Sequence, residues 1–120
     1  MNSLLLKIFI ILLIFVGEAL AIYAEIVGAK SYSINHNLFF KIFFRMFLIL
    51  AIGGALLIFG YILGFNVFKN IWIVSVISIT SILIIEPILN YVIIEQLPTI
   101  GAVVGLIFGI LGFIFTLTIK

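Results

Sequence analysis

Long apolar runs separated by short polar joints fill almost the whole chain, and this pattern predicts its architecture. The runs span approximately residues 4–29, 46–65, 71–94 and 100–119. Each reaches the roughly 20 mostly apolar residues that a membrane-crossing helix needs. We therefore expect four transmembrane helices in a single domain, residues 1–120. Because the joints are short, consecutive helices should be antiparallel neighbours. The expected fold class is an all-α integral membrane protein, a four-helix bundle.

Two segments between the runs have a character of their own. The joint 30–37 is polar, and Leu38–Arg45 after it mixes phenylalanines with two cations, a composition typical of a membrane–water interface. The joint 95–99 contains Pro98, which suits the start of a helix.

Composition supports the membrane location and argues against several functions. The chain is 67% hydrophobic and 8% charged, whereas soluble domains are about 45–50% apolar and about 25% charged. It has no cysteine, no aspartate and one histidine, so we expect no metal site, no cofactor and no enzymatic activity. The net charge of +2 comes from six scattered Lys and Arg residues, too diffuse for a nucleic-acid surface.

The first residues imitate a cleavable signal peptide. Lys7 precedes an apolar stretch, and Ala19–Ala21 looks like a cleavage site. However, Glu18 lies directly ahead of that triplet, and the apolar pattern continues beyond it. We therefore expect an uncleaved first transmembrane helix.

The cations leave the membrane orientation open, although cytoplasmic loops normally carry an excess of Lys and Arg. The side with both termini holds Lys7, Lys69 and Lys120, and the other side holds Lys30, Lys41 and Arg45. Equal numbers allow two interpretations. Either the balance is an accident of a small count, or copies insert in both directions and pair antiparallel.

Glu18 is the most unusual residue of the first run, because a carboxylate in mid-membrane is costly unless it is paired, protonated or hydrated. Glu25 follows seven residues later and so lies within about 20° of it around a helix. Small residues flank the same face. We predict that Glu18 binds protons or substrate, with Glu25 as a second candidate.

The third run gathers its polar residues on one face. Within an arc of about 120°, at 100° per residue, lie our further candidates for substrate or proton binding, Trp72, Ser75, Ser78, Glu86 and Asn90. Pro87 should bend this helix and free the carbonyl of Leu83. The alternative is that these groups only form hydrogen bonds between helices.

Glycines take the place of polar residues in the fourth run. They repeat at spacings that place them on one stripe, Gly101, Gly105, Gly109 and Gly112. Helix backbones can approach closely at such a stripe, so we assign it to a dimer interface; packing inside the protomer is the alternative. For the glycines of the second run, Gly53, Gly54, Gly60 and Gly64, we favour packing within the bundle.

The arrangement resembles the drug/metabolite transporter superfamily, and within it the small multidrug resistance branch. The likeness rests on Glu18, or else on Glu25 within Ala24-Glu-Ile-Val-Gly28, and on the tail from Glu95-Gln-Leu-Pro to Gly105-Leu-Ile-Phe-Gly-Ile-Leu-Gly112. The stretch 85–95 also looks like the repeat unit of the larger, ten-span EamA-like relatives. Nearly the whole chain is covered, through short hydrophobic motifs.

The chain also departs from that family's pattern. Trp72 takes one place of the aromatic pair of the third span, and Ser75 stands where the second is expected. The first joint is longer and more polar, and Glu25 and Glu86 are additional acids. These departures put the multidrug substrate range in doubt.

The resemblance implies a dimer in a prokaryotic plasma membrane, formed by two copies or with a paralogous subunit, that exports a small cationic or amphipathic solute by alternating access. Glu18 would bind a proton or the solute in turn. Trp72 would offer its ring to a cation, and Ser75 and Ser78 would orient the polar part of the solute.

Other functions remain open at this point. A flippase subunit for a lipid-linked sugar or polyprenyl phosphate would use Lys30, Lys41 and Arg45. A membrane module without transport activity, assembling with a larger complex, is another alternative. A fluoride-type channel ranks lower, because its Asn and Phe pattern is not visible.

Overall fold

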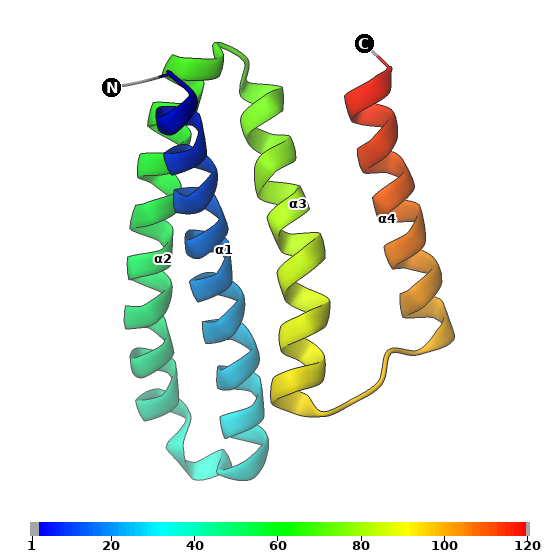
Figure 1. Cartoon of the computed structure of the whole chain (residues 1–120). Coiled ribbons are helices and arrows are strands. Elements are labelled where there is room, and N and C mark those ends of the chain that lie inside the picture. Colours follow the sequence, from blue (N-terminus) through cyan, green and yellow to red (C-terminus); the bar gives the residue numbers. More distant parts are fainter. Residues whose placement is uncertain (1–2, 120) are drawn as a thin grey trace.

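The chain folds into four long helices that run alternately up and down (Figure 1). The structure is a computed structural model and describes residues 3–119, apart from the side chain at 117. The long helices are α1 (Ser3–Ile34), α2 (Phe39–Phe68), α3 (Ile71–Leu89) and α4 (Ile100–Thr118). A short 3₁₀ helix, η1 (His36–Leu38), precedes α2, and a π-helix, η2 (Asn90–Ile94), continues α3. The predicted all-α class with four helices is confirmed.

Three of these helical segments are long and apolar enough to cross a membrane. They are Ser3–Ile34, His36–Phe68 and Ile71–Ile94, with hydropathies of 2.2 to 2.6. α4 is a shorter apolar helix in the part that is described. The length and apolar composition of these helices indicate a multi-pass integral membrane protein. Lys120, which entered the count of cations, lies outside the described residues.

The first polar joint, residues 30–37, is largely helical, so the helices on either side of it extend beyond the predicted spans 4–29 and 46–65. α1 continues to Ile34, and only Asn35 separates it from η1. α2 then begins at Phe39, so the aromatic and basic segment is helical as well. The physical reason is that extending an existing helix fixes only one residue per added hydrogen bond, and the Ser33 hydroxyl donates a hydrogen bond to the Lys30 carbonyl at 2.7 Å.

α1 is the central helix, and glycines allow α2 to approach it closely. A Cβ atom on Gly53 would lie 2.9 Å from the carbonyl oxygen of Gly17, and one on Gly60 would lie 2.8 Å from Ile14 Cγ1. A Cβ atom on Gly64 would likewise lie 3.0 Å from Cγ2 of Val74 on α3. Gly54 has nothing within 4 Å. Three of the four glycines of α2 thus serve packing inside the protomer.

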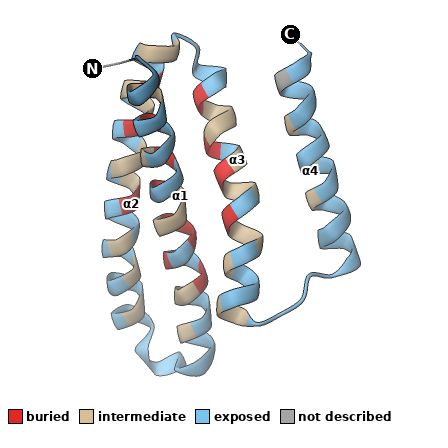
Figure 2. Cartoon of the chain, in the orientation of Figure 1, coloured by how far each residue is buried: buried red, intermediate tan, exposed pale blue. Residues whose placement is uncertain are grey.

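Burial is concentrated where α1, α2 and α3 meet (Figure 2). Two apolar clusters form there, one built on Ile10, Ile14 and Val74, the other on Ile22, Ile26 and Ile85. α4 contacts only α3 among the described elements, and nearly all of its described side chains are exposed. Packing of α4 inside the protomer therefore leaves most of its apolar surface uncovered.

Candidate functional site

The centre of the protomer holds a polar contact between two helices that are mostly apolar. The hydroxyl of Ser78 on α3 donates a hydrogen bond of 2.5 Å to Oε1 of Glu18 on α1. Along α1, Glu18 lies between the two apolar clusters, after Ile14 and before Ile22. Ser78 is only 6% exposed, and Glu18 is half-buried. The contact between Glu18 and Ser78 thus lies between two apolar clusters.

Glu18 stands at the middle of α1, fifteen residues after Ser3 and sixteen before Ile34. At about 1.5 Å per residue, it lies about 23 Å from either end of the helix. That depth places the carboxyl group where bulk water does not reach it if α1 crosses the membrane.

No cation neutralises Glu18 within the part of the chain that is described. The described Lys and Arg residues lie near helix ends, at Lys7, Lys30, Lys41, Arg45 and Lys69. The Ser78 hydroxyl is the one hydrogen-bond partner of the carboxyl group among residues 3–119. An unpaired carboxylate in the middle of a membrane helix is costly, and this makes Glu18 the most conspicuous polar group of α1.

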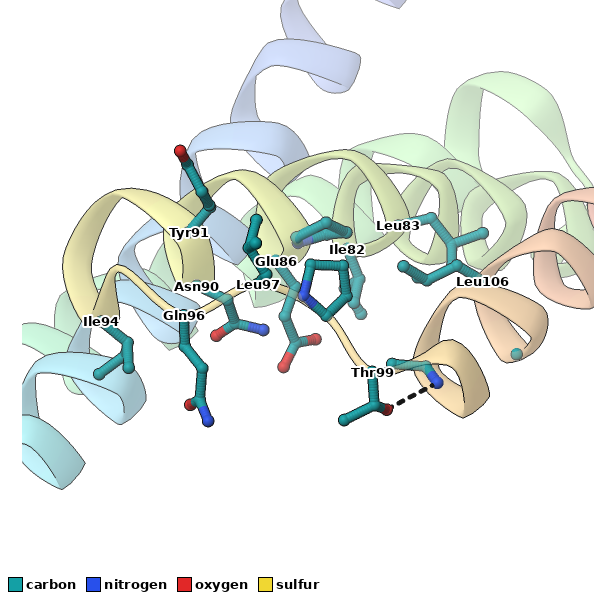
Figure 3. A pocket seen from close by; sticks show the side chains of 14 residues that line it. Ile82, Leu83, Glu86, Asn90, Tyr91, Ile94, Gln96, Leu97, Thr99 and Leu106 are labelled. Atoms are coloured by element: carbon teal, nitrogen blue, oxygen red, sulfur yellow. Dashed lines mark hydrogen bonds between the residues drawn. The ribbon is translucent and has the colours of Figure 1, made fainter.

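A second candidate site lies between α3 and α4. It is an open cavity of about 640 Å³, which we call the α3–α4 cavity. Its polar lining comes from the end of α3, η2 and the connection to α4, namely Glu86, Asn90, Tyr91, Gln96 and Thr99. Figure 3 shows Glu86, Asn90 and Gln96 pointing to the same side. The carboxyl group of Glu86 makes no ion pair or hydrogen bond with another described residue.

The helix changes its geometry next to this cavity. α3 passes through Pro87 and ends at Leu89, where the π-helix begins. Because Pro87 has no N–H, it cannot donate to the Leu83 carbonyl, as predicted from the sequence. This π-helix ends α3 and carries Asn90 and Tyr91, both of which line the cavity.

The remaining candidate residues lie elsewhere. Glu25 is exposed and lines an apolar groove of about 330 Å³ between α1 and α2. Trp72 is 74% exposed near the start of α3, and Ser75 is half-buried. Near Glu25, the residues of α1 that pack against Ile85 of α3 are Ile22 and Ile26, not Glu25. The structure therefore joins Glu18 with Ser78 and Glu86 with Asn90, but gathers no common site from the whole set.

The glycine stripe of α4 is largely open within the protomer. A Cβ on Gly105 or Gly112 would have no neighbour within 4 Å, and one on Gly101 would reach only Thr99 Oγ1 at 3.9 Å. Gly109 is different, because its Cβ would lie 3.3 Å from Leu83 of α3. Packing inside the protomer thus accounts for one of these glycines and not for the other three.

Two features of this region were missed from the sequence. Gln96 and Thr99 join Glu86 at the cavity, which depends on how the connection 95–99 folds back. Lys30 extends from the end of α1 and donates a hydrogen bond of 2.7 Å to the carbonyl of Ile93. A cation at a helix C-terminus is favourable. The only sequence signal was the presence of polar residues in both joints.

Comparison of the chain with protein-family models, curated proteins and solved structures found no match. What the structure supports is a small all-helical membrane protein with three long apolar helices and a shorter one.

Proposed function

We propose that the protein is a small secondary transporter that exchanges protons for a cationic solute. The observation that carries the proposal is Glu18, a carboxyl group at the middle of an apolar helix with a serine hydroxyl as its partner and no cation. Such intramembrane acids are typically proton or ion sites. The resemblance to the small multidrug resistance branch adds to this proposal.

In the proposed mechanism, Glu18 holds one positive charge at a time. A proton bound on one side of the membrane leaves when a cationic solute takes its place, and the solute leaves when a proton returns. Ser78 fixes the orientation of the carboxyl group in both states, because its hydroxyl can donate a hydrogen bond to the proton-bound carboxyl group and to the carboxylate that holds the solute.

The transport unit in this proposal is a dimer in which α4 is the fourth membrane span and forms the contact. Three glycines of α4 have space that the protomer does not fill, and α4 packs on α3 alone among the described elements. A second copy, or a paralogous subunit, packed against this stripe would gain close van der Waals contact. The α3–α4 cavity, whose lining includes Gly105 of this stripe, would then lie beside the dimer contact.

The test compares the same substitution, Glu to Gln, at two positions of the chain, Glu18 and Glu95. Protein in liposomes is exposed to a tetraphenylphosphonium gradient, and the resulting proton flux is read from a pH-sensitive dye inside. Glu18→Gln should reduce the flux to that of empty liposomes. Glu95→Gln is the matched control, because Glu95 lies in the exposed connection before α4 and bonds no other side chain among the described residues.

Undiminished flux in Glu18→Gln would overturn the mechanism. Loss of flux only in Glu86→Gln would move the essential acid to the α3–α4 cavity. If wild-type liposomes show no cation-dependent proton flux with any quaternary cation, the protein is not a transporter of this class.

A further inference from the structure

A recess rich in basic and polar groups lies where α1 ends and α2 begins. It encloses about 230 Å³, several times the roughly 30 Å³ that one water molecule occupies in the liquid. Its lining comes from the last turn of α1, the residues after it and the first two turns of α2, namely Ser31, Ile34, Asn35, Leu38, Lys41, Ile42 and Arg45. We call it the basic recess.

The two cations of the basic recess are available to a ligand. Lys41 and Arg45 are four residues apart on α2 and so lie on the same face, one turn from each other. Neither forms an ion pair or hydrogen bond with another described residue. Lys30, the third cation at this end of the protein, is already bonded to the Ile93 carbonyl. Two adjacent like charges with no acid beside them repel each other, and an anion between them would relieve that repulsion.

The position of the basic recess is that of a lipid headgroup. Rings follow one another from the end of α1 along the start of α2, with centroid separations of 4.8 to 6.0 Å, through Tyr32, His36, Phe39, Phe40, Phe43, Phe44 and Phe47. Aromatic residues beside Lys and Arg at the ends of apolar helices are typical of the membrane–water interface. The apolar part of the lining comes from Ile34, Leu38 and Ile42.

We propose that the basic recess binds the phosphate of an anionic phospholipid. The guanidinium of Arg45 is suited to hold two phosphate oxygens at once, and Lys41 adds a second positive charge. Asn35 and Ser31 supply an amide and a hydroxyl for the remaining headgroup oxygens. The apolar part of the lining suits the first carbons of the acyl chains. This site is independent of Glu18 and of the transport proposal.

The test measures lipid selectivity of the whole chain. Delipidated protein in neutral detergent is titrated with phosphatidylglycerol or with phosphatidylcholine, and bound lipid is counted by native mass spectrometry. Each basic group near an anionic headgroup is worth about 1 kcal/mol, so the two together should favour phosphatidylglycerol by about 30-fold. The double variant K41Q/R45Q should bind the two lipids equally.

A matched double variant removes the same charge from the opposite end of the protein. K7Q/K69N alters cations outside the basic recess, and Asn tolerates the left-handed backbone of Lys69, whose φ is 56°. This variant should keep the selectivity of the wild-type protein. Retained helical circular dichroism in both variants excludes misfolding as the cause.

Three results would overturn the proposal. The first is selectivity that survives in K41Q/R45Q, and the second is equal loss in K7Q/K69N, which would reduce the effect to net charge. The third is displacement of bound phosphatidylglycerol by millimolar inorganic phosphate, which would show a site for a soluble anion.

Discussion

The contact between α1 and α2 at Gly53 gives a prediction in which two neighbouring glycines can be compared. A Cβ on Gly53 would lie 2.9 Å from the Gly17 carbonyl oxygen, 3.1 Å from Leu20 Cβ and 3.2 Å from the Ala21 nitrogen. These atoms belong to the backbone of α1 or sit directly on it, so no side-chain rotation can relieve the contact. Gly53→Ala must therefore move α1 and α2 apart, next to Glu18.

The expected loss of unfolding free energy in Gly53→Ala is worked out by comparison with Gly54→Ala. Gly54 is on the same helix and has nothing within 4 Å of a Cβ. Both substitutions gain the same helix preference of alanine over glycine, about 0.8–1 kcal/mol, and this term cancels in the difference. What remains is the cost of overpacking, about 1–3 kcal/mol. We expect Gly53→Ala to be less stable than Gly54→Ala by about 2 kcal/mol, because backbone atoms yield less than side chains.

The assay is reversible unfolding in mixed micelles of a mild detergent and dodecyl sulfate, followed by far-ultraviolet circular dichroism. The free energy of unfolding is compared among the wild-type protein, Gly53→Ala and Gly54→Ala. Equal stability of the two variants would refute the close approach of α1 and α2 and the position it gives to Glu18.

Two further predictions concern α4 and the end of α3. Gly112→Leu should lower the dimer fraction at least about tenfold by light scattering in detergent while the protomer stays folded. Gly54→Leu is the control and should not lower the dimer fraction, because a Cβ at Gly54 likewise has no neighbour within 4 Å but lies on α2. Equal dimerisation of both variants would remove α4 from the interface. Lys30→Gln should lower the free energy of unfolding by about 1 kcal/mol, because the Ile93 carbonyl loses a charged donor. Lys41→Gln is the control, because Lys41 makes no such hydrogen bond. An equal loss of unfolding free energy in Lys41→Gln would contradict the reasoning.

The helices themselves could be predicted from the sequence, because the length of an apolar run is a local property. Runs of about 20 apolar residues require hydrogen-bonded helices in lipid whatever their neighbours are. Glu18 was identified in the same way, since a carboxylate in mid-span is conspicuous without any structure. The helical extension of α1 to Ile34 was not predicted, because polarity does not decide whether a helix continues.

The partners of each residue were decided only by the tertiary structure. Helical periodicity placed Glu18 and Glu25 on one face, but the way α1 crosses its neighbours turns Glu18 to Ser78 and leaves Glu25 at the groove beside α2. Gly53 and Gly54 are adjacent in the sequence, yet only Gly53 meets α1. Lys41 and Arg45 form a recess only because Ser31 and Asn35 return beside them. The sequence determines which residues share a helix face; the crossing of the helices determines what that face meets.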